Sequence, residues 1–159
     1  MRILKPRASL LPERPVLGWR EWVGLPDFGV ERIKTKIDTG ARTSALHALE
    51  PTQFVRDGKS LVQFRLHPVQ RKSKPELLCE APLVDCRSVI SSGGHIEHRF
   101  VILTQILLGE RLILAEVTLT NRTLMGFRML VGRTTIGRKF LVDPGRSFLT
   151  TRHKTGETP

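Results

Sequence analysis

The stretch Ile33-Lys34-Thr35-Lys36-Ile37-Asp38-Thr39-Gly40-Ala41 decides how the rest of the chain can fold. Isoleucine and threonine alternate with lysine up to residue 37, and this period of two predicts a half-buried strand. Residues 43–46 also favour a strand, so Asp38 should lie in a tight turn between two strands. There the Asp38 carboxylate can face a groove, and Gly40 lets another backbone segment come close. A capping Asp in an ordinary β-turn has the same three letters, so the triplet alone leaves both interpretations open.

The length and composition indicate one globular domain. The chain has 159 residues, of which 40% are hydrophobic and 26% are charged. A chain near this size can bury a substantial core. It contains no run of about 18 apolar residues, which a membrane-spanning helix would need. Residues 1–7 lack the apolar core of a signal peptide. We therefore expect a cytoplasmic location and no membrane partner.

The charge balance favours acidic partners. Lys and Arg outnumber Asp and Glu by 26 to 15, which gives a net charge of +11. The basic residues are spread along the chain, and the one dense cluster, residues 71–74, has no aromatic residues interleaved with it. A stacking platform for nucleic-acid bases needs such aromatic residues. We interpret the charge as a property of solubility and encounter and do not expect nucleic acid as a partner.

Short strands separated by Gly and Pro turns predict an all-β barrel or a closed, folded-over sheet. We expect residues 1–15 to form an extended arm, residues 16–150 the domain and residues 151–159 a flexible tail. A hairpin turns at Asp57-Gly58, a pair that suits a two-residue turn with positive φ. Pro51 and Pro82 should break strands, residues 104–108 fit either a strand or a helix, and residues 134–138 should form one short helix. The expected strands are 16–23, 30–37, 43–49, the 54–66 hairpin, 77–90, 96–103, 112–119 and 140–142.

Two segments about ninety residues apart carry a resemblance to a known family. Residues 37–41, Ile-Asp-Thr-Gly-Ala, and residues 129–133, Met-Leu-Val-Gly-Arg, resemble the retropepsin-like aspartic peptidase pattern. Residues 18–21, 36–48 and 121–123 extend it to a bacterial and archaeal family labelled as ATP-dependent zinc proteases. That family is linked by gene neighbourhood to the ribosomal-protein glutamate ligase. The resemblance covers residues 16–145 and implies a single-lobe closed barrel with one short C-terminal helix.

The resemblance also implies a mechanism and a set of site residues. Two adjacent carboxylates share one proton, so that one activates a water and the other acts as the acid. The chain has one Asp-Thr-Gly, and Asp143-Pro144-Gly145 lacks the hydroxyl residue. The implied protein is therefore a homodimeric aspartic endopeptidase, with the catalytic Asp38 of each copy at the twofold axis. Thr39, Gly40 and Ala41 would support this pair of carboxylates, and Leu130, Val131 and Gly132 would form the crossing element beneath it.

The sequence departs from the viral members of that class at two places. Arg42 stands where viral relatives carry an acidic residue that pairs with the Arg after the crossing glycine, here Arg133. Two Arg cannot pair, so that clamp is absent or rebuilt, and Arg42 either attracts an acidic substrate or points to solvent. The substrate-covering flap is either the 91–94 tip, with Ser91, Gly93 and Gly94, or the 57–58 hairpin. About thirty extra residues between Asp38 and Gly132 indicate an insertion.

Two other functions stay open. The chain could be a non-catalytic module of the same fold that binds or regulates the glutamate ligase, or it could be a zinc-dependent peptidase. A zinc site would need residues such as His47, His95 and a carboxylate, because His95 and His98 do not form a His-Glu-x-x-His helix. No phosphate-binding glycine loop is present, and we expect no metal and no cofactor. Cys79 and Cys86 are expected to be reduced.

Overall fold

We analysed a computed structural model of the chain, which describes residues 13–90, 93–123 and 125–150. The expected flexible tail and most of the expected N-terminal arm lie outside the described residues. The elements are β1 (Val16–Gly18), β2 (Arg20–Leu25), η1 (Pro26–Phe28), β3 (Val30–Ile37), β4 (Ser44–His47), β5 (Leu49–Arg56), β6 (Lys59–Leu66), β7 (Leu77–Ile90), β8 (Ile96–Leu108), β9 (Arg111–Thr120), β10 (Met129–Val131), α1 (Arg133–Ile136) and β11 (Leu141–Asp143).

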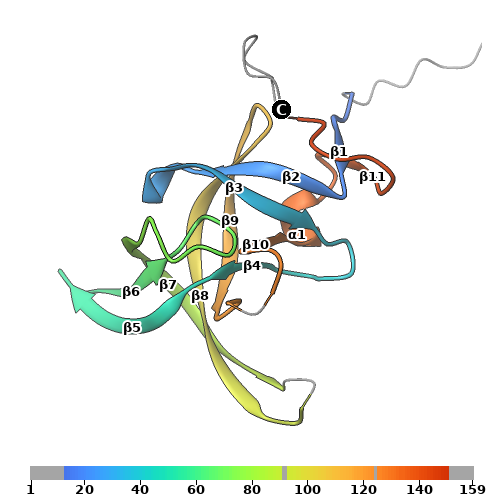
Figure 1. Cartoon of the computed structure of the whole chain (residues 1–159). Helices are drawn as coiled ribbons and strands as arrows, with labels where there is room; N and C mark the ends of the chain where they lie inside the picture. Colours follow the sequence, from blue (N-terminus) through green and yellow to red (C-terminus); the bar gives the residue numbers. More distant parts are fainter. Residues whose placement is uncertain (1–12, 91–92, 124, 151–159) are drawn as a thin grey trace, which may run out of the picture.

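Six of these strands pair in a closed ring and form a barrel. The strands can be followed by their labels in Figure 1. The order is β2-β3-β10-β4-β9-β8, and β8 pairs back onto β2 through Val23 opposite Leu108. The inward residues of the barrel strands, among them Ile33, Leu46 and Ile106, are fully buried. The predicted all-β closed barrel with one short helix is therefore confirmed.

The short strand β10 is the element that positions the Asp38 turn. It lies between β3 and β4, parallel to β3 and antiparallel to β4. Val131 pairs with Ile37, so the end of β10 stands beside the residue that precedes Asp38. The helix α1 follows directly. Strands far apart in sequence thus meet at residue 38.

The hairpin β5–β6 lies outside the barrel and extends the sheet through the first half of β7. Asp57 and Gly58 have φ values of 52° and 74°, which confirms the predicted turn. Pro51 does not end a strand as expected, because β5 continues through it. The strand lies at the edge of the sheet, and its register shifts between Leu49 and Thr52. An edge strand with such an irregularity can tolerate a residue that lacks an N–H.

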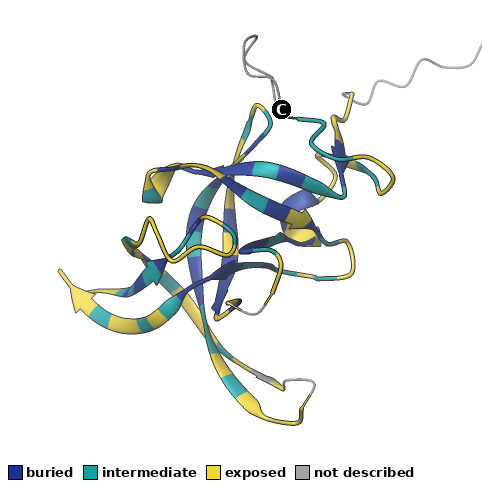
Figure 2. Ribbon diagram, viewed as in Figure 1, coloured by how far each residue is buried: buried dark blue, intermediate teal, exposed yellow. Residues whose placement is uncertain are grey.

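The hairpin β7–β8 is a long arm that projects from the barrel (Figure 1), and the outer part of it is largely exposed (Figure 2). The expected break at Pro82 is wrong, since β7 is continuous. Instead, β7 changes partner there: it pairs with β6 up to Pro82 and with β8 from Leu83 onward. Residues 104–108, ambiguous in the sequence, are part of β8.

The expected strand 16–23 is two strands in different sheets. β1 pairs in parallel with β11, whereas β2 belongs to the barrel. Buried Glu21 explains part of this break. Its carboxylate accepts hydrogen bonds from the N–H groups of Gly18, Leu149 and Thr150, which ties the C-terminal segment to the start of the barrel.

No helix in the described part of the chain has the length and apolar character needed to cross a membrane.

Candidate active site

The Asp38 turn is held by its own backbone and by β10. One Asp38 carboxylate oxygen accepts the N–H groups of Gly40 at 3.0 Å and Ala41 at 3.2 Å. The Asp38 N–H donates to the Val131 carbonyl at 2.9 Å. The Asp38 residue is half-buried, while Thr39 and Gly40 are exposed. The turn therefore presents an ordered carboxylate at the surface of the protein.

Gly132 lets the chain cross beneath this turn. A Cβ at residue 132 would lie 2.7 Å from the carbonyl carbon of Thr43, closer than real Cβ atoms come to backbone. The Gly132 N–H donates to the Ser44 hydroxyl at 3.1 Å, and that hydroxyl lies 2.6 Å from the hydroxyl of Thr135. The Arg133 N–H donates to the Ala41 carbonyl at 2.8 Å. Of the predicted crossing residues, Val131 and Gly132 therefore lie against the segment 38–43, whereas Leu130 pairs with Lys36 and Ala45 within the sheet.

The Arg133 side chain binds the turn without the ion pair that an acidic residue 42 would have formed with it. Its guanidinium donates to the Thr39 carbonyl at 2.9 Å, so it fixes the turn through the backbone. Arg42 is exposed and lines a cavity of about 240 Å³. A hydrogen bond from Arg133 to the Thr39 backbone thus replaces the ion pair of the viral relatives. Arg42 takes no part in it and lies at the cavity wall.

Arg122 is the feature of the site that sequence reasoning missed. Its residue is 9% exposed, and its Nε donates to the Phe127 carbonyl at 2.9 Å. Burial and then the positive charge of Arg99 lower the pKa of the Arg122 guanidinium, and the Asp38 carboxylate opposes this shift. Arg122 is therefore a mostly buried positive charge that lies within electrostatic range of the Asp38 carboxylate. Residues 121–123 were part of the family resemblance, but nothing in the sequence around Arg122 indicated a role for its side chain.

His47 holds the segment that carries Arg122. It is fully buried on β4, and its Nδ1 accepts the Arg122 N–H at 2.9 Å. Its Nε2 lies 3.3 Å from Nη1 of Arg128. Burial lowers the pKa of His47 to about 4, with smaller contributions from the charges of Arg128, His67 and Arg122. His47 is therefore neutral at pH 7 and acts as an acceptor for the Arg122 segment.

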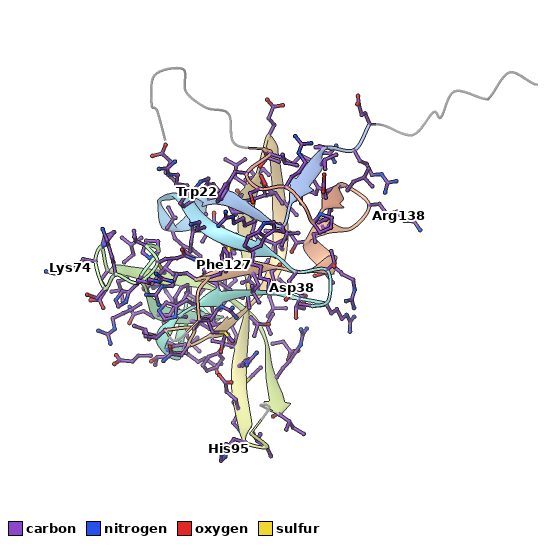
Figure 3. All side chains as sticks on the ribbon, turned by 45° about the vertical axis from the view of Figure 1, so that its right-hand side comes forward. Trp22, Asp38, Lys74, His95, Phe127 and Arg138 are labelled. Atoms are coloured by element: carbon purple, nitrogen blue, oxygen red, sulfur yellow. The ribbon has the colours of Figure 1, made fainter. Side chains whose placement is uncertain are left out.

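The zinc arrangement considered from the sequence is not assembled. His47 is committed to the Arg122 segment inside the barrel, whereas His95 lies at the far tip of the β7–β8 arm, away from Asp38 (Figure 3). No group of three or more His, Cys, Asp or Glu side chains that could hold a metal occurs in the residues that the structure describes. Cys79 is buried and Cys86 is exposed, and both are free.

Residues from the projecting part of the β7–β8 arm line two cavities. The larger, of about 410 Å³, combines residues of β8 with the segment after β9; it is lined by Glu97, Arg99, Thr120, Asn121, Arg122, Thr123 and Met125. The smaller combines the loop after Asp38 with β7 and β9; it is lined by Arg42, Thr43, Arg87, Leu114, Ala115, Glu116 and Thr134. The 57–58 hairpin contributes to neither cavity.

The structure thus brings together some of the expected site residues and separates others. Asp38, Thr39, Gly40, Ala41 and the crossing residues 130–132 form one unit, with Arg42 at its border. Gly93 and Gly94 lie near the tip of the arm, and Ser91 is outside the described residues. The basic cluster around Lys74 lies on the opposite side of the molecule from Arg138 (Figure 3).

A single closed barrel whose Asp-Thr-Gly turn rests on a Gly-containing crossing strand defines the class of single-lobe, retropepsin-like proteins. The chain belongs to the RimB-like family, described as "Retropepsin-like aspartic endopeptidase RimB", whose model matches residues 16–153. The resemblance stated from the sequence is therefore confirmed. At the coarse level, the family places the chain with hydrolases.

The relatives add a second kind of protein. Two proteins named "Probable alpha-L-glutamate ligase", from Shewanella halifaxensis and Shewanella pealeana, are each 47% identical over 133 residues. The match covers 84% of this chain but only 29% of each ligase, so the chain spans less than a third of these relatives. A crystal structure of Lpg0085, a Legionella pneumophila protein described as of unknown function, has a TM-score of 0.75 at 26% identity and covers 87% of this chain and 100% of its own.

Proposed function

We propose that this protein is a homodimeric aspartic endopeptidase in which Asp38 from two copies forms the catalytic pair. The observation that carries the proposal is an Asp-Thr-Gly turn with its full set of supports but a single carboxylate. Gly132, Arg133 and Val131 hold the turn within one copy, while Thr39 and Gly40 remain exposed. A second copy that packs on this surface would bury the exposed turn and supply the missing acid.

The chemistry follows from two carboxylates that share one proton. The ionised Asp38 takes a proton from a water while the water oxygen attacks the peptide carbonyl carbon. The protonated Asp38 of the other copy donates its proton to the carbonyl oxygen. The tetrahedral intermediate then collapses: the carbon–nitrogen bond breaks, the amine leaves with a proton from the first Asp38, and the second Asp38 takes back a hydroxyl proton as the new carboxyl group forms. The pair titrates as a unit across this cycle.

The residues around Asp38 have supporting roles in this proposal. The N–H groups of Gly40 and Ala41 hold one Asp38 oxygen, which leaves the other to face the substrate. The Thr39 hydroxyl would hydrogen-bond across the axis to the other copy, since its carbonyl is already fixed by Arg133. The β7–β8 arm, rather than the 57–58 hairpin, would act as the flap, because residues of the arm line both cavities.

We further propose an acidic, glutamate-containing peptide as the substrate. Arg122 in one cavity and Arg42 in the other form no ion pair with any carboxylate in the described residues, and the chain carries a net charge of +11. A half-desolvated Arg is well suited to bind a carboxylate. The relatives that contain a matching segment are named glutamate ligases, so a hydrolase of glutamyl peptide bonds would oppose the reaction of the ligase.

Cleavage of paired synthetic peptides tests this proposal. One peptide contains a run of glutamates and its partner contains glutamines at the same positions. The proposal expects wild-type protein to cleave the glutamate peptide at least about tenfold faster, and Asp38→Asn to cleave neither. Undiminished cleavage by Asp38→Asn would overturn the aspartic mechanism. Equal cleavage of both peptides would overturn only the substrate class.

The relatives also favour a second candidate, a non-catalytic module that binds the glutamate ligase. The matching segment is a minor part of chains named as ligases, which is the arrangement of an accessory domain. The mark of this function is binding to a glutamate ligase that survives Asp38→Asn, together with no cleavage of any peptide by wild-type protein.

A further inference from the structure

Glu97 is a carboxylate that the protein itself supplies to the cavity of Arg122. It lies on β8 and lines the larger cavity together with Arg99 and Thr120. Nε and Nη2 of Arg99 donate to one Glu97 oxygen at 3.2 and 3.0 Å, and the Thr120 hydroxyl donates to the other oxygen at 3.1 Å. A substrate carboxylate in this cavity would compete for the same three donor groups.

The cavity holds two positive charges and one internal negative charge. Arg99 is close enough to Arg122 to lower the pKa of the Arg122 guanidinium. Glu97 neutralises Arg99, whereas the terminal nitrogens of Arg122 have no carboxylate partner in the part of the chain that the structure describes. A carboxylate that replaced Glu97 could interact with both Arg side chains at once.

The Glu97 contact is exchangeable. The side chains of Glu97 and Arg99 are 41% and 26% exposed, and ion pairs at such positions contribute little to stability. The smaller cavity differs in this respect. There Arg87 is held by two carboxylates, Asp85 at 2.9 Å and Glu116 at 3.3 Å, so displacement would have to remove both.

We propose that Glu97 is a specificity-determining residue: it occupies Arg99 and Thr120 in the free protein and is displaced by an acidic side chain of the substrate. The inference rests on the proposed acidic substrate and deepens it. A neutral side chain cannot replace the Glu97 carboxylate without leaving Arg99 unpaired, so Glu97 excludes neutral residues from this cavity. It also weakens the binding of acidic ones by the free energy of its own contact.

Peptide binding in an Asp38→Asn background tests the proposal without cleavage. Fluorescence anisotropy with a labelled tetraglutamate peptide measures the affinity, and the tetraglutamine peptide measures discrimination. Glu97→Gln should tighten tetraglutamate binding about 5- to 10-fold, because the internal competitor is lost. Glu80→Gln is the matched control. Glu80 forms a similar ion pair with Arg56 of the β5–β6 hairpin, and its loss changes the net charge equally.

Each outcome decides the matter. A gain in Glu97→Gln that is absent in Glu80→Gln, and that disappears when Arg99→Gln is added, supports the proposal. An unchanged affinity in Glu97→Gln, or an equal gain in Glu80→Gln, overturns it. If wild-type protein cleaves the glutamate peptide while Glu97→Gln behaves like its parent, only the role of Glu97 fails. If tetraglutamate binds neither protein, the proposed substrate fails and the role of Glu97 fails with it.

Discussion

The turns at Asp38 and Asp143 have the same local structure and different surroundings. Asp38 directly follows β3 and Asp143 is the last residue of β11, and in each turn one carboxylate oxygen accepts the N–H of the glycine two residues later at 3.0 Å. Around Asp38, however, β10 and the Arg133 side chain arrive from about ninety residues away. At Asp143 the turn continues into a segment whose Arg146 carbonyl accepts the Trp19 N–H at 2.8 Å, which links the C-terminal segment to the first strands.

The comparison shows that an Asp-x-Gly turn does not define a site by itself. Its local hydrogen bond is a common way to stabilise a turn. What distinguishes Asp38 is its set of contacts with residues remote in sequence: Gly132 packs beneath the turn, and the Arg133 guanidinium donates to the Thr39 carbonyl. The Asp143 turn ties strands together, whereas the Asp38 turn presents a carboxylate.

The largest expected difference between the turns is in catalysis. Asp38→Asn should reduce peptide cleavage by about 10³-fold or more, because it removes the acid–base group, while Asp143→Asn should change it less than about twofold. Steady-state cleavage of the glutamate peptide measures both. Comparable losses of cleavage in the two variants would show that the two turns do not differ in catalysis.

The second difference concerns the glycines. Gly132→Ala should destabilise the fold by about 2–3 kcal/mol, since its Cβ would meet the Thr43 backbone at 2.7 Å. Gly145→Ala should change stability by less than about 0.5 kcal/mol, because its nearest contact is an ordinary 3.4 Å to the Asp143 carboxylate. Urea unfolding followed by circular dichroism gives both values. A Gly132→Ala protein as stable as wild type would show that the crossing can relax.

The third prediction concerns how the stability of the fold depends on pH through His47, which holds the Arg122 segment. The pKa of folded His47 is about 4, below its ordinary value of 6.5, so its contribution to stability is complete above pH 6.5 and is lost as the pH falls toward 4. Between pH 7 and pH 4, wild type should lose about 2 kcal/mol more than His47→Gln, which cannot titrate. Unfolding free energies of the two proteins, compared at several pH values, isolate this residue. Parallel pH profiles would contradict the assignment.

The smallest expected effect is at the exposed hydroxyl beside Asp38, where the Asp143 turn has Pro144. Thr39→Val should weaken self-association by about tenfold through the loss of a hydrogen bond across the axis, with no change in the stability of the single chain. Thr52→Val, at an exposed threonine on β5, is the control. Sedimentation velocity over a range of concentrations distinguishes the two variants.

Much of this structure could be predicted from local patterns and the family resemblance. The Asp57-Gly58 turn follows from the need for positive φ, and the crossing at Gly132 follows from the resemblance. The misplaced breaks at Pro51 and Pro82 arose because local signals do not say whether a strand lies at an edge or changes partner. The interruption at Trp19 depends on buried Glu21 and on residues 149–150, which are remote in sequence.

The role of Arg122 was equally hidden from the sequence. An Arg in a short polar segment between strands is usually solvated. Here His47 and Phe127 fix it in a half-desolvated position, and both contacts depend on the closed barrel. Its neighbour Arg99 comes from a different strand. Only the assembled fold brings Arg99 and Arg122 together in one cavity.

Subunit mixing tests the central claim, that one catalytic centre needs Asp38 from two copies. Half of the wild-type protein is replaced by Asp38→Asn at constant total concentration, and the mixture is equilibrated until subunits have exchanged. If each active centre needs two intact copies, cleavage should fall to about one quarter of the wild-type rate, the fraction of wild-type homodimers. A fall to only about one half, as expected for copies that act independently, would contradict the account.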